Sequence, residues 1–291
     1  MTATSDTEPR QRLIPLPARG GAMAALEMGP TDRPVDIVFS HANGFNAWTY
    51  RSILQPLATS LRILALDLRG HGASTLPIVI EGRQGWLEFR DDLLALLSAA
   101  VEAPVVLAGH SMGGTCSLLA AAIEPARVRA LALFDPVIFP MEAQGADTAH
   151  SPLVGGALRR RPSFPSKQAA YEAYLGRGAF RTWEPVQLAD YVAAGFRDTE
   201  TGEVTLTCSP EWEASNFRTH NYDPWAGFGA SRCPIRILRA ETASTFRLDG
   251  REVELTADGR ITVETIPGTS HFLPMERPDL VRASLTAAVA L

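Results

Sequence analysis

The feature that most constrains the fold is an alternation of short apolar runs with helical segments along the chain. Six runs rich in Val, Ile, Leu and Ala are predicted to be buried strands, at residues 35–40, 61–67, 104–108, 128–135, 235–239 and 261–266. Near-continuous apolar runs are typical of parallel strands, because helices cover both faces of such a sheet. Helices are predicted between and after these strands, at 86–101, 113–123 and 278–291. This order predicts an α/β fold with a doubly wound, mostly parallel sheet.

The alternation stops after residue 138 and resumes near residue 230. The segment 139–229 has no clear buried strand, and its residues 166–175 and 184–194 are predicted to be helical. It is also dense in aromatic residues. We therefore predict that residues 1–138 and 230–291 form the core and that 139–229 is a helical cap inserted between core strands. The alternative is an ordinary helical subdomain that packs with its own aromatic residues.

Composition limits the possible partners and the compartment. The 291 residues carry a net charge of −5, which argues against a nucleic-acid binder, because such a protein needs a basic face. The three cysteines have no metal-ligand spacing and are typical of reduced thiols. Residues 1–12 do not resemble a signal peptide, and no apolar run approaches the roughly 20 residues that span a bilayer. We expect a cytoplasmic protein with no membrane or nucleic-acid partner. Its expected oligomeric state is a monomer or a homodimer.

Residues 109–113, Gly-His-Ser-Met-Gly, lie between a predicted strand and a predicted helix. This is the strand–turn–helix context that the G-x-S-x-G motif requires. The turn strains the backbone of the serine, and glycine at positions 109 and 113 avoids a collision between neighbouring side chains. The hydroxyl of Ser111 then projects beside the positive end of the following helix. The motif predicts that Ser111 is a nucleophile.

A serine hydroxyl needs a base within hydrogen-bond reach, and the chain has six histidines. His271 follows the strand 261–266 on a loop that precedes the last helix, so it can reach the carboxyl edge of the sheet and is the predicted base. His110 is expected to point away from the serine hydroxyl. His41 and His71 lie on glycine-containing loops and are expected to be structural or to line the pocket. The other two histidines lie in the insertion, where we expect them at the surface.

An acyl-transfer site also needs donors for the developing oxyanion. The backbone N–H of Met112, directly after the serine, is one candidate. The loop 40–45 after the first predicted strand supplies the second, for which we select the N–H of Asn43; the alternative is that this loop is merely a turn. Residues in these loops and aromatic residues of the insertion are the candidates for the substrate pocket: His41, Phe45, His110, Trp183, Trp212 and Phe217.

Four ordered motifs resemble those of the α/β-hydrolase superfamily. Residues 41–45, His-Ala-Asn-Gly-Phe, resemble its His-Gly oxyanion motif with alanine in place of the usual glycine, and 67–72 match its D-x-R-G-H-G loop. Residues 109–113 match the nucleophile motif, and 268–272 resemble the terminal G-x-x-H-F. The resemblance implies a mixed, mainly parallel sheet, a cap inserted after the sixth strand, and chemistry with no metal and no organic cofactor.

The acid of the expected triad is where the sequence departs from the family. The family often places an aspartate after the seventh strand, but the matching position here is Ala243, with Glu241 nearby. Some members place the acid after the sixth strand, a position that matches Asp135. Pro136 should break the strand there and leave the carboxylate at the carboxyl edge of the sheet. We predict Asp135 as the acid, with Glu241 as the alternative.

These residues predict a serine hydrolase that forms an acyl-enzyme on Ser111 and then transfers the acyl group to water. The aromatic insertion suggests a small to medium apolar carboxylic ester, lactone or thioester as substrate. A carbon–carbon bond hydrolase and a cofactor-free lyase or perhydrolase are alternatives that share the fold. A ligand receptor without turnover is a further alternative, which the serine–histidine pair disfavours.

Overall fold

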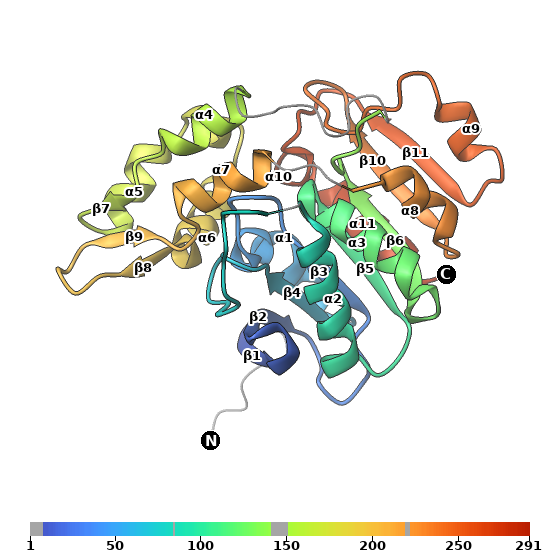
Figure 1. The fold of residues 1–291 in the computed structure, drawn as a ribbon, viewed down its shortest axis with the longest axis horizontal. Coiled ribbons are helices and arrows are strands. Elements are labelled where there is room, and N and C mark those ends of the chain that lie inside the picture. The colour runs from blue at the N-terminus through green and yellow to red at the C-terminus, as the bar shows by residue number, and fades with distance from the viewer. Residues whose placement is uncertain (1–7, 84, 141–150, 219–221) are drawn as a thin grey trace.

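The computed structural model describes residues 8–83, 85–140, 151–218 and 222–291. Its main feature is an eight-stranded sheet with the order β1-β2-β4-β3-β5-β6-β10-β11 (Figure 1). β2 pairs antiparallel with both β1 and β4, and all other neighbours are parallel. The strands are β1 (Arg10–Leu16), β2 (Gly21–Met28), β3 (Ile37–Ser40), β4 (Ile63–Asp67), β5 (Val105–His110), β6 (Val128–Phe134), β10 (Ile235–Ala240) and β11 (Ile261–Ile266).

The six predicted strands correspond to β3, β4, β5, β6, β10 and β11, so the predicted mostly parallel sheet is confirmed. The prediction missed the antiparallel hairpin of β1 and β2. β1 lies at the edge of the sheet, and its side chains alternate between partly buried and exposed at its start. A strand of this kind carries no continuous apolar run, because only one of its faces is buried.

Helices cover both faces of the sheet, as in a doubly wound fold. α2 and α3 pack on one face together with α8, and α1 and α11 pack on the other. The core helices are α1 (Arg51–Leu54), α2 (Leu87–Ala100), α3 (Met112–Ile123), α8 (Pro224–Ala230), α9 (Glu252–Thr256), α10 (Leu273–Glu276) and α11 (Pro278–Val289). Short 3-10 turns are η1 (Pro17–Arg19), η2 (Ala47–Tyr50), η3 (Gln55–Thr59), η4 (Pro125–Arg127) and η6 (Gly178–Phe180).

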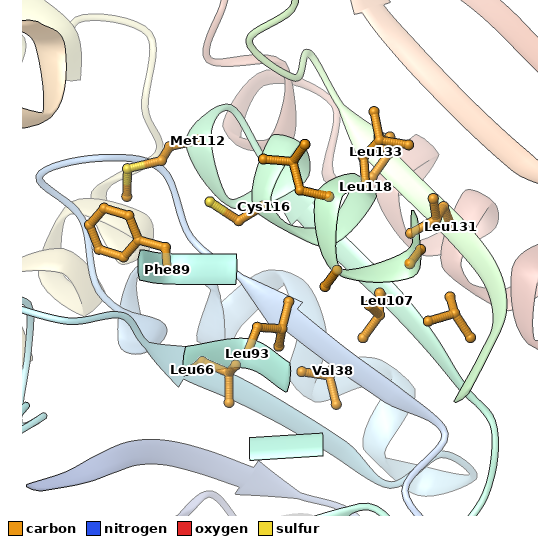
Figure 2. Packing of buried hydrophobic residues seen from close by; sticks show 14 of the residues in the cluster. Val38, Leu66, Phe89, Leu93, Leu107, Met112, Cys116, Leu118, Leu131 and Leu133 are labelled. Atoms are coloured by element: carbon orange, nitrogen blue, oxygen red, sulfur yellow. The ribbon is translucent and has the colours of Figure 1, made fainter. Parts of the chain in front are cut away.

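Alternate side chains of each central strand enter opposite cores. Val38 of β3 joins the core beneath α2 and α3, whereas its neighbours Ile37 and Phe39 join the core on the α11 side. Figure 2 shows the first of these cores, in which leucines of β4, β5 and β6 lie between the strands and the side chains of α2 and α3. Burial on both faces explains why these strands are apolar throughout.

The chain between β6 and β10 contains the insertion. Its helices and strands gather on one side of the core in Figure 1, and three short strands form an antiparallel sheet with the order β7-β9-β8. These elements are α4 (Pro152–Leu158), β7 (Ser163–Phe164), α5 (Lys167–Tyr174), α6 (Pro185–Gly195), β8 (Phe196–Asp198), β9 (Val204–Leu206) and α7 (Pro210–Arg218). The two predicted helices are α5 and α6. The small sheet was not predicted, because strands of two or three residues leave no periodic pattern.

All of α8 except its last residue lies within the predicted range of the cap, but the helix packs on the core. A Cβ atom added at Gly227 would lie 3.3 Å from the side chain of Leu118 on α3. The predicted cap range of 139–229 thus contains one helix that lies with the core helices. The predicted surface positions of His150 and His220 fall outside the described residues. In the described part of the chain, no helix combines the length and apolar character needed to cross a membrane.

The turn after β5 is strained, and only glycine fits on either side of it. Ser111 has φ 53° and ψ −123°, a conformation that L-residues rarely adopt. A Cβ atom at Gly113 would lie 2.2 Å from the carbonyl oxygen of Ser40, and one at Gly109 would lie 2.5 Å from the backbone of Gly113. β3, β5 and α3 can therefore approach closely enough to place Ser111 at the carboxyl edge of the sheet.

Gly113→Ala tests this close approach. Both Gly113 and Gly156 are helical glycines, but Gly156 on α4 has no atom within 4 Å of an added Cβ. We expect Gly113→Ala to lower the free energy of unfolding by about 1–3 kcal/mol or more, because backbone must move. Gly156→Ala should raise it by about 0.5–1 kcal/mol, since alanine is the better helix former. Urea unfolding measures both, and equal effects of the two substitutions would contradict the account.

Candidate active site

Ser111 and His271 meet at the carboxyl edge of the sheet. The Nε2 atom of His271 lies 3.0 Å from the Oγ atom of Ser111. The turn after β5 holds the serine, whose backbone N–H donates to the carbonyl of Phe134 at 3.0 Å. His271 lies on the loop between β11 and α10. Since the carboxyl ends of parallel strands share one edge, residues 160 positions apart become hydrogen-bonding neighbours.

The carboxylate that contacts His271 is that of Asp135, directly after β6. Its Oδ2 atom lies 2.7 Å from the Nδ1 atom of His271, and its side chain is fully buried. The same carboxylate accepts hydrogen bonds from the backbone N–H groups of Ala240 and Thr245 and from the hydroxyl of Ser244. Three loops of the sheet edge thus converge on one carboxylate.

These contacts decide the charge of Asp135. Burial by itself would raise its pKa, but the hydrogen bond and charge of His271, with the donors Ser244 and Ala240, hold the pKa below its usual value. An ionised carboxylate only accepts hydrogen bonds, so Nδ1 of His271 carries the proton that joins them. With the proton on Nδ1, Nε2 is the ring nitrogen that can accept the proton of Ser111.

Asp135 shares an unusual backbone conformation with the serine. It has φ 43°, in the left-handed region that non-glycine residues rarely occupy, and its N–H donates to the carbonyl of Leu238 at 2.8 Å. Pro136 follows and ends the strand. The strain is outweighed by the hydrogen bonds to β10 and its following loop, which fix both the backbone and the carboxylate.

Glu241 lies elsewhere. Its side chain is exposed, and its Oε2 atom accepts a hydrogen bond from the backbone N–H of Gly268 at 2.9 Å. The structure therefore brings Asp135, and not Glu241, to the ring of His271. Glu241 instead joins the loop after β10 to the loop after β11.

The two predicted oxyanion donors, the backbone N–H groups of Met112 and Asn43, make no hydrogen bond to protein acceptors in the described part of the chain. Met112 begins α3, where the helix dipole favours negative charge. Asn43 lies in a turn after β3, closed by a hydrogen bond from the N–H of Phe45 to the carbonyl of Ala42. These free donors are suited to a developing oxyanion.

His41 and His71 hold the turn that contains Asn43. Each ring donates from Nδ1 to a backbone carbonyl, and each Nε2 accepts a backbone N–H: that of Leu68 for His41 at 2.9 Å, and that of Gly44 for His71 at 3.1 Å. Burial lowers the pKa of both, to about 4 for His71, so both are neutral. His41, a predicted pocket residue, is wholly buried and has both ring nitrogens occupied by backbone, so it supports the loop and does not line a pocket.

His110 links the loop 40–45 to His271. Its Nε2 lies 2.7 Å from the carbonyl of His271, which only accepts, so Nε2 carries the proton and Nδ1 accepts the hydroxyl of Tyr50 at 2.8 Å. Tyr50 in turn accepts the N–H of Ala42 at 3.2 Å. Burial lowers the pKa of His110 to about 3 and keeps it neutral. Both ring nitrogens of His110 thus bond to groups other than Ser111, and His110 is fully buried and so is not a wall of the pocket.

The remaining pocket candidates lie in different places. Phe45 and Trp183 contact each other with ring centroids 5.2 Å apart, and both lie near Phe272, the neighbour of His271. Trp212 is fully buried over Gly70, and its Nε1 donates to the carbonyl of Arg69, so it packs the insertion onto the core. Phe217 packs against a small cluster of the insertion: Val154, Ala157 and Ala214.

Sequence reasoning missed several residues of the site. Tyr50 donates a hydrogen bond to His110, and Ser244 and Thr245 each donate one to Asp135, yet none of the three belongs to a motif. His71 was recognised in its loop but not as the partner of Gly44. No pattern in the sequence marks these contacts, because they depend on which loops the fold brings together.

Comparison with known proteins agrees with this architecture. The sequence model described as the alpha/beta hydrolase family matches residues 37–284. The chain belongs to the alpha/beta hydrolase family. The resemblance drawn from its motifs is therefore confirmed at the level of the family and the fold.

Individual relatives are distant or partial. A 2-(acetamidomethylene)succinate hydrolase from Mesorhizobium japonicum is 22% identical over 250 residues, which are 86% of each chain. The crystal structure of an E-2-(acetamidomethylene)succinate hydrolase superposes with a TM-score of 0.82 at 21% identity, over 98% of this chain and all of that one. The dihydrolipoyllysine-residue acetyltransferase component of an acetoin cleaving system from Pseudomonas putida is 38% identical over 106 residues, and the match spans 27% of that protein.

Proposed function

We propose that the protein is a serine hydrolase that forms an acyl-enzyme on Ser111. The observation that carries the proposal is the continuous hydrogen-bonded chain from the Ser111 hydroxyl through His271 to the buried carboxylate of Asp135. The N–H of Met112, directly after the serine, and the N–H of Asn43, in the turn after β3, are the proposed oxyanion donors. A nucleophile, a base, an orienting acid and two oxyanion donors together make up the apparatus of acyl transfer.

In the first half of the reaction, Oγ of Ser111 attacks the substrate carbonyl while Nε2 of His271 takes its proton. The carbonyl oxygen becomes an oxyanion and accepts hydrogen bonds from Met112 and Asn43, each worth about 2.7–4 kcal/mol in such sites. His271 then gives its proton to the leaving group as the carbon–oxygen or carbon–sulfur bond breaks. Asp135 stabilises the imidazolium that exists between these steps.

In the second half, water attacks the acyl-enzyme and His271 takes a proton from it. The tetrahedral intermediate collapses, the bond from carbon to Oγ breaks, and Ser111 regains its proton from His271. The products are a carboxylic acid and an alcohol or thiol, and the enzyme returns to its starting state. No step in this sequence needs a metal or an organic cofactor.

The aromatic surroundings of His271 support an apolar substrate. The ring centroid of Phe272 lies 5.9 Å from that of His271, and Phe45 and Trp183 contact Phe272 in turn. Transfer of apolar substrate groups from water to such an apolar site lowers their free energy. We therefore propose a small to medium apolar carboxylic ester, lactone or thioester as the small-molecule substrate.

A panel of p-nitrophenyl esters, lactones, thioesters and diketones tests the proposed reaction. We expect turnover of apolar esters, lactones or thioesters, with kcat/KM higher for an apolar acyl chain than for a charged chain of equal length. An ester substrate quenched during turnover should leave the mass of its acyl group on the protein. Cleavage of diketones alone would instead favour a carbon–carbon bond hydrolase, and absence of all turnover would favour a receptor.

Asp135→Asn tests the assignment of the acid. Asparagine keeps the shape but removes the charge that stabilises imidazolium and can turn the wrong ring nitrogen toward Ser111, so kcat should fall by about 10⁴-fold. The matched control is Glu241→Gln, which removes a surface charge but keeps a side-chain oxygen that can accept from the N–H of Gly268, and it should cost less than about threefold, as surface changes usually do. The opposite ranking of the two variants in steady-state assays would show that Asp135 is not the acid.

A further inference from the structure

The side chain of Asn43 ties the loop 40–45, which we call the oxyanion loop, to the inserted segment. Its Nδ2 atom donates to the carbonyl of Glu213 at 3.0 Å, and its Oδ1 atom accepts from the Nδ2 atom of Asn216 at 2.7 Å. Both partners lie on α7, and the Asn216 side chain is fully buried. The backbone N–H of Asn43 is the proposed oxyanion donor, so α7 holds the residue that carries this donor.

Only one orientation of the side-chain amides of Asn43 and Asn216 gives every donor an acceptor and every acceptor a donor. Arg83 donates to Oδ1 of Asn216, and a guanidinium has no acceptor, so Nδ2 of Asn216 must face Asn43. The carbonyl of Glu213 has no proton to donate, so Nδ2 of Asn43 must face it. Turning either amide over would place two donors or two acceptors against each other. The loop is therefore held in one defined position.

α7 itself is fixed to the core at Trp212 and at Asn216. The indole of Trp86 donates to the carbonyl of Asn216, and the indole of Trp212 donates to the carbonyl of Arg69, each at 3.0 Å. The Glu213 carboxylate packs against Gly44, where an added Cβ would lie 2.7 Å from Oε1. α7 thus acts as a fixed support for the loop.

We propose that Asn216 is a positioning residue for the oxyanion hole and that it acts through the side chain of Asn43. The proposal rests on the proposed function and goes beyond it, because it assigns a catalytic role to the inserted segment. Asn216 touches no reacting atom. Its effect is confined to the position of the Asn43 N–H, which matters most when the carbonyl oxygen becomes an oxyanion.

Asn216→Asp separates this role from packing. The aspartate keeps the size and the acceptor for Arg83 but presents an acceptor to Oδ1 of Asn43, so the loop must shift. We expect kcat, and the rate at which Ser111 reacts with a fluorophosphonate, to fall about tenfold, with KM within about twofold of wild type. A boronic acid, whose tetrahedral adduct places an oxygen in the oxyanion hole, should lose affinity by the same factor. The matched control is Ser215→Ala, which removes a hydrogen bond from Arg83 but leaves Asn43 untouched and should keep wild-type values.

Asn43→Ala breaks the same contact from its other end and keeps the backbone N–H. It should lower kcat as Asn216→Asp does, which keeps the proposal testable if the aspartate variant does not fold. Asn216→Ala should have the same effect, and the double variant Asn43→Ala with Asn216→Ala should match Asn43→Ala alone. Additive losses, or a wild-type rate in Asn43→Ala, would overturn the proposal.

The two proposals fail in different ways. If wild-type protein neither reacts with the fluorophosphonate at Ser111 nor turns over a substrate, the proposed function fails, and the role of Asn216 fails with it. If the wild type is active and Asn216→Asp folds and works at the wild-type rate, only the role of Asn216 fails. Circular dichroism and melting temperature establish which variants fold.

Discussion

The buried carboxylate of Asp135 is the contact on which the geometry of the site depends. It receives the ring of His271, the N–H of Ala240 and the side chain of Ser244, so it joins the ends of β6, β10 and β11. A buried anion without such donors would be costly, because no water solvates it. The donors that stabilise its charge also fix the tautomer and direction of the histidine that faces Ser111.

Neutral hydrogen-bonding side chains hold the loop 40–45 in place relative to His271. Tyr50 and His110 connect the N–H of Ala42 to the carbonyl of His271, so the loop 40–45 and His271 are held by one series of hydrogen bonds. His71 holds Gly44 from the side of β4, and α7 holds Asn43 from the side of the insertion. Since burial keeps these histidines uncharged, their roles as donor and acceptor do not change near neutral pH.

The parts that could be predicted from sequence are those that leave a local pattern. The central strands are apolar because both their faces are buried, and the turn at Ser111 needs glycine on either side because a Cβ would meet backbone. β1 leaves no such pattern, because it is a half-exposed edge strand. Asn216 meets Asn43 across 173 residues, a contact that depends on how the insertion docks and that no spacing reveals. Trp212 was a reasonable pocket candidate by composition, but it fills the space above Gly70.

The most direct test of the central claim is to locate the covalent adduct of a fluorophosphonate by intact mass and peptide mapping. The account predicts one adduct on wild-type protein, at Ser111, and none on Ser111→Ala. The variant should stay folded, because the hydroxyl makes no contact that the core requires. An adduct that persists in folded Ser111→Ala, or that maps to another residue, would contradict the assignment of Ser111 as the nucleophile.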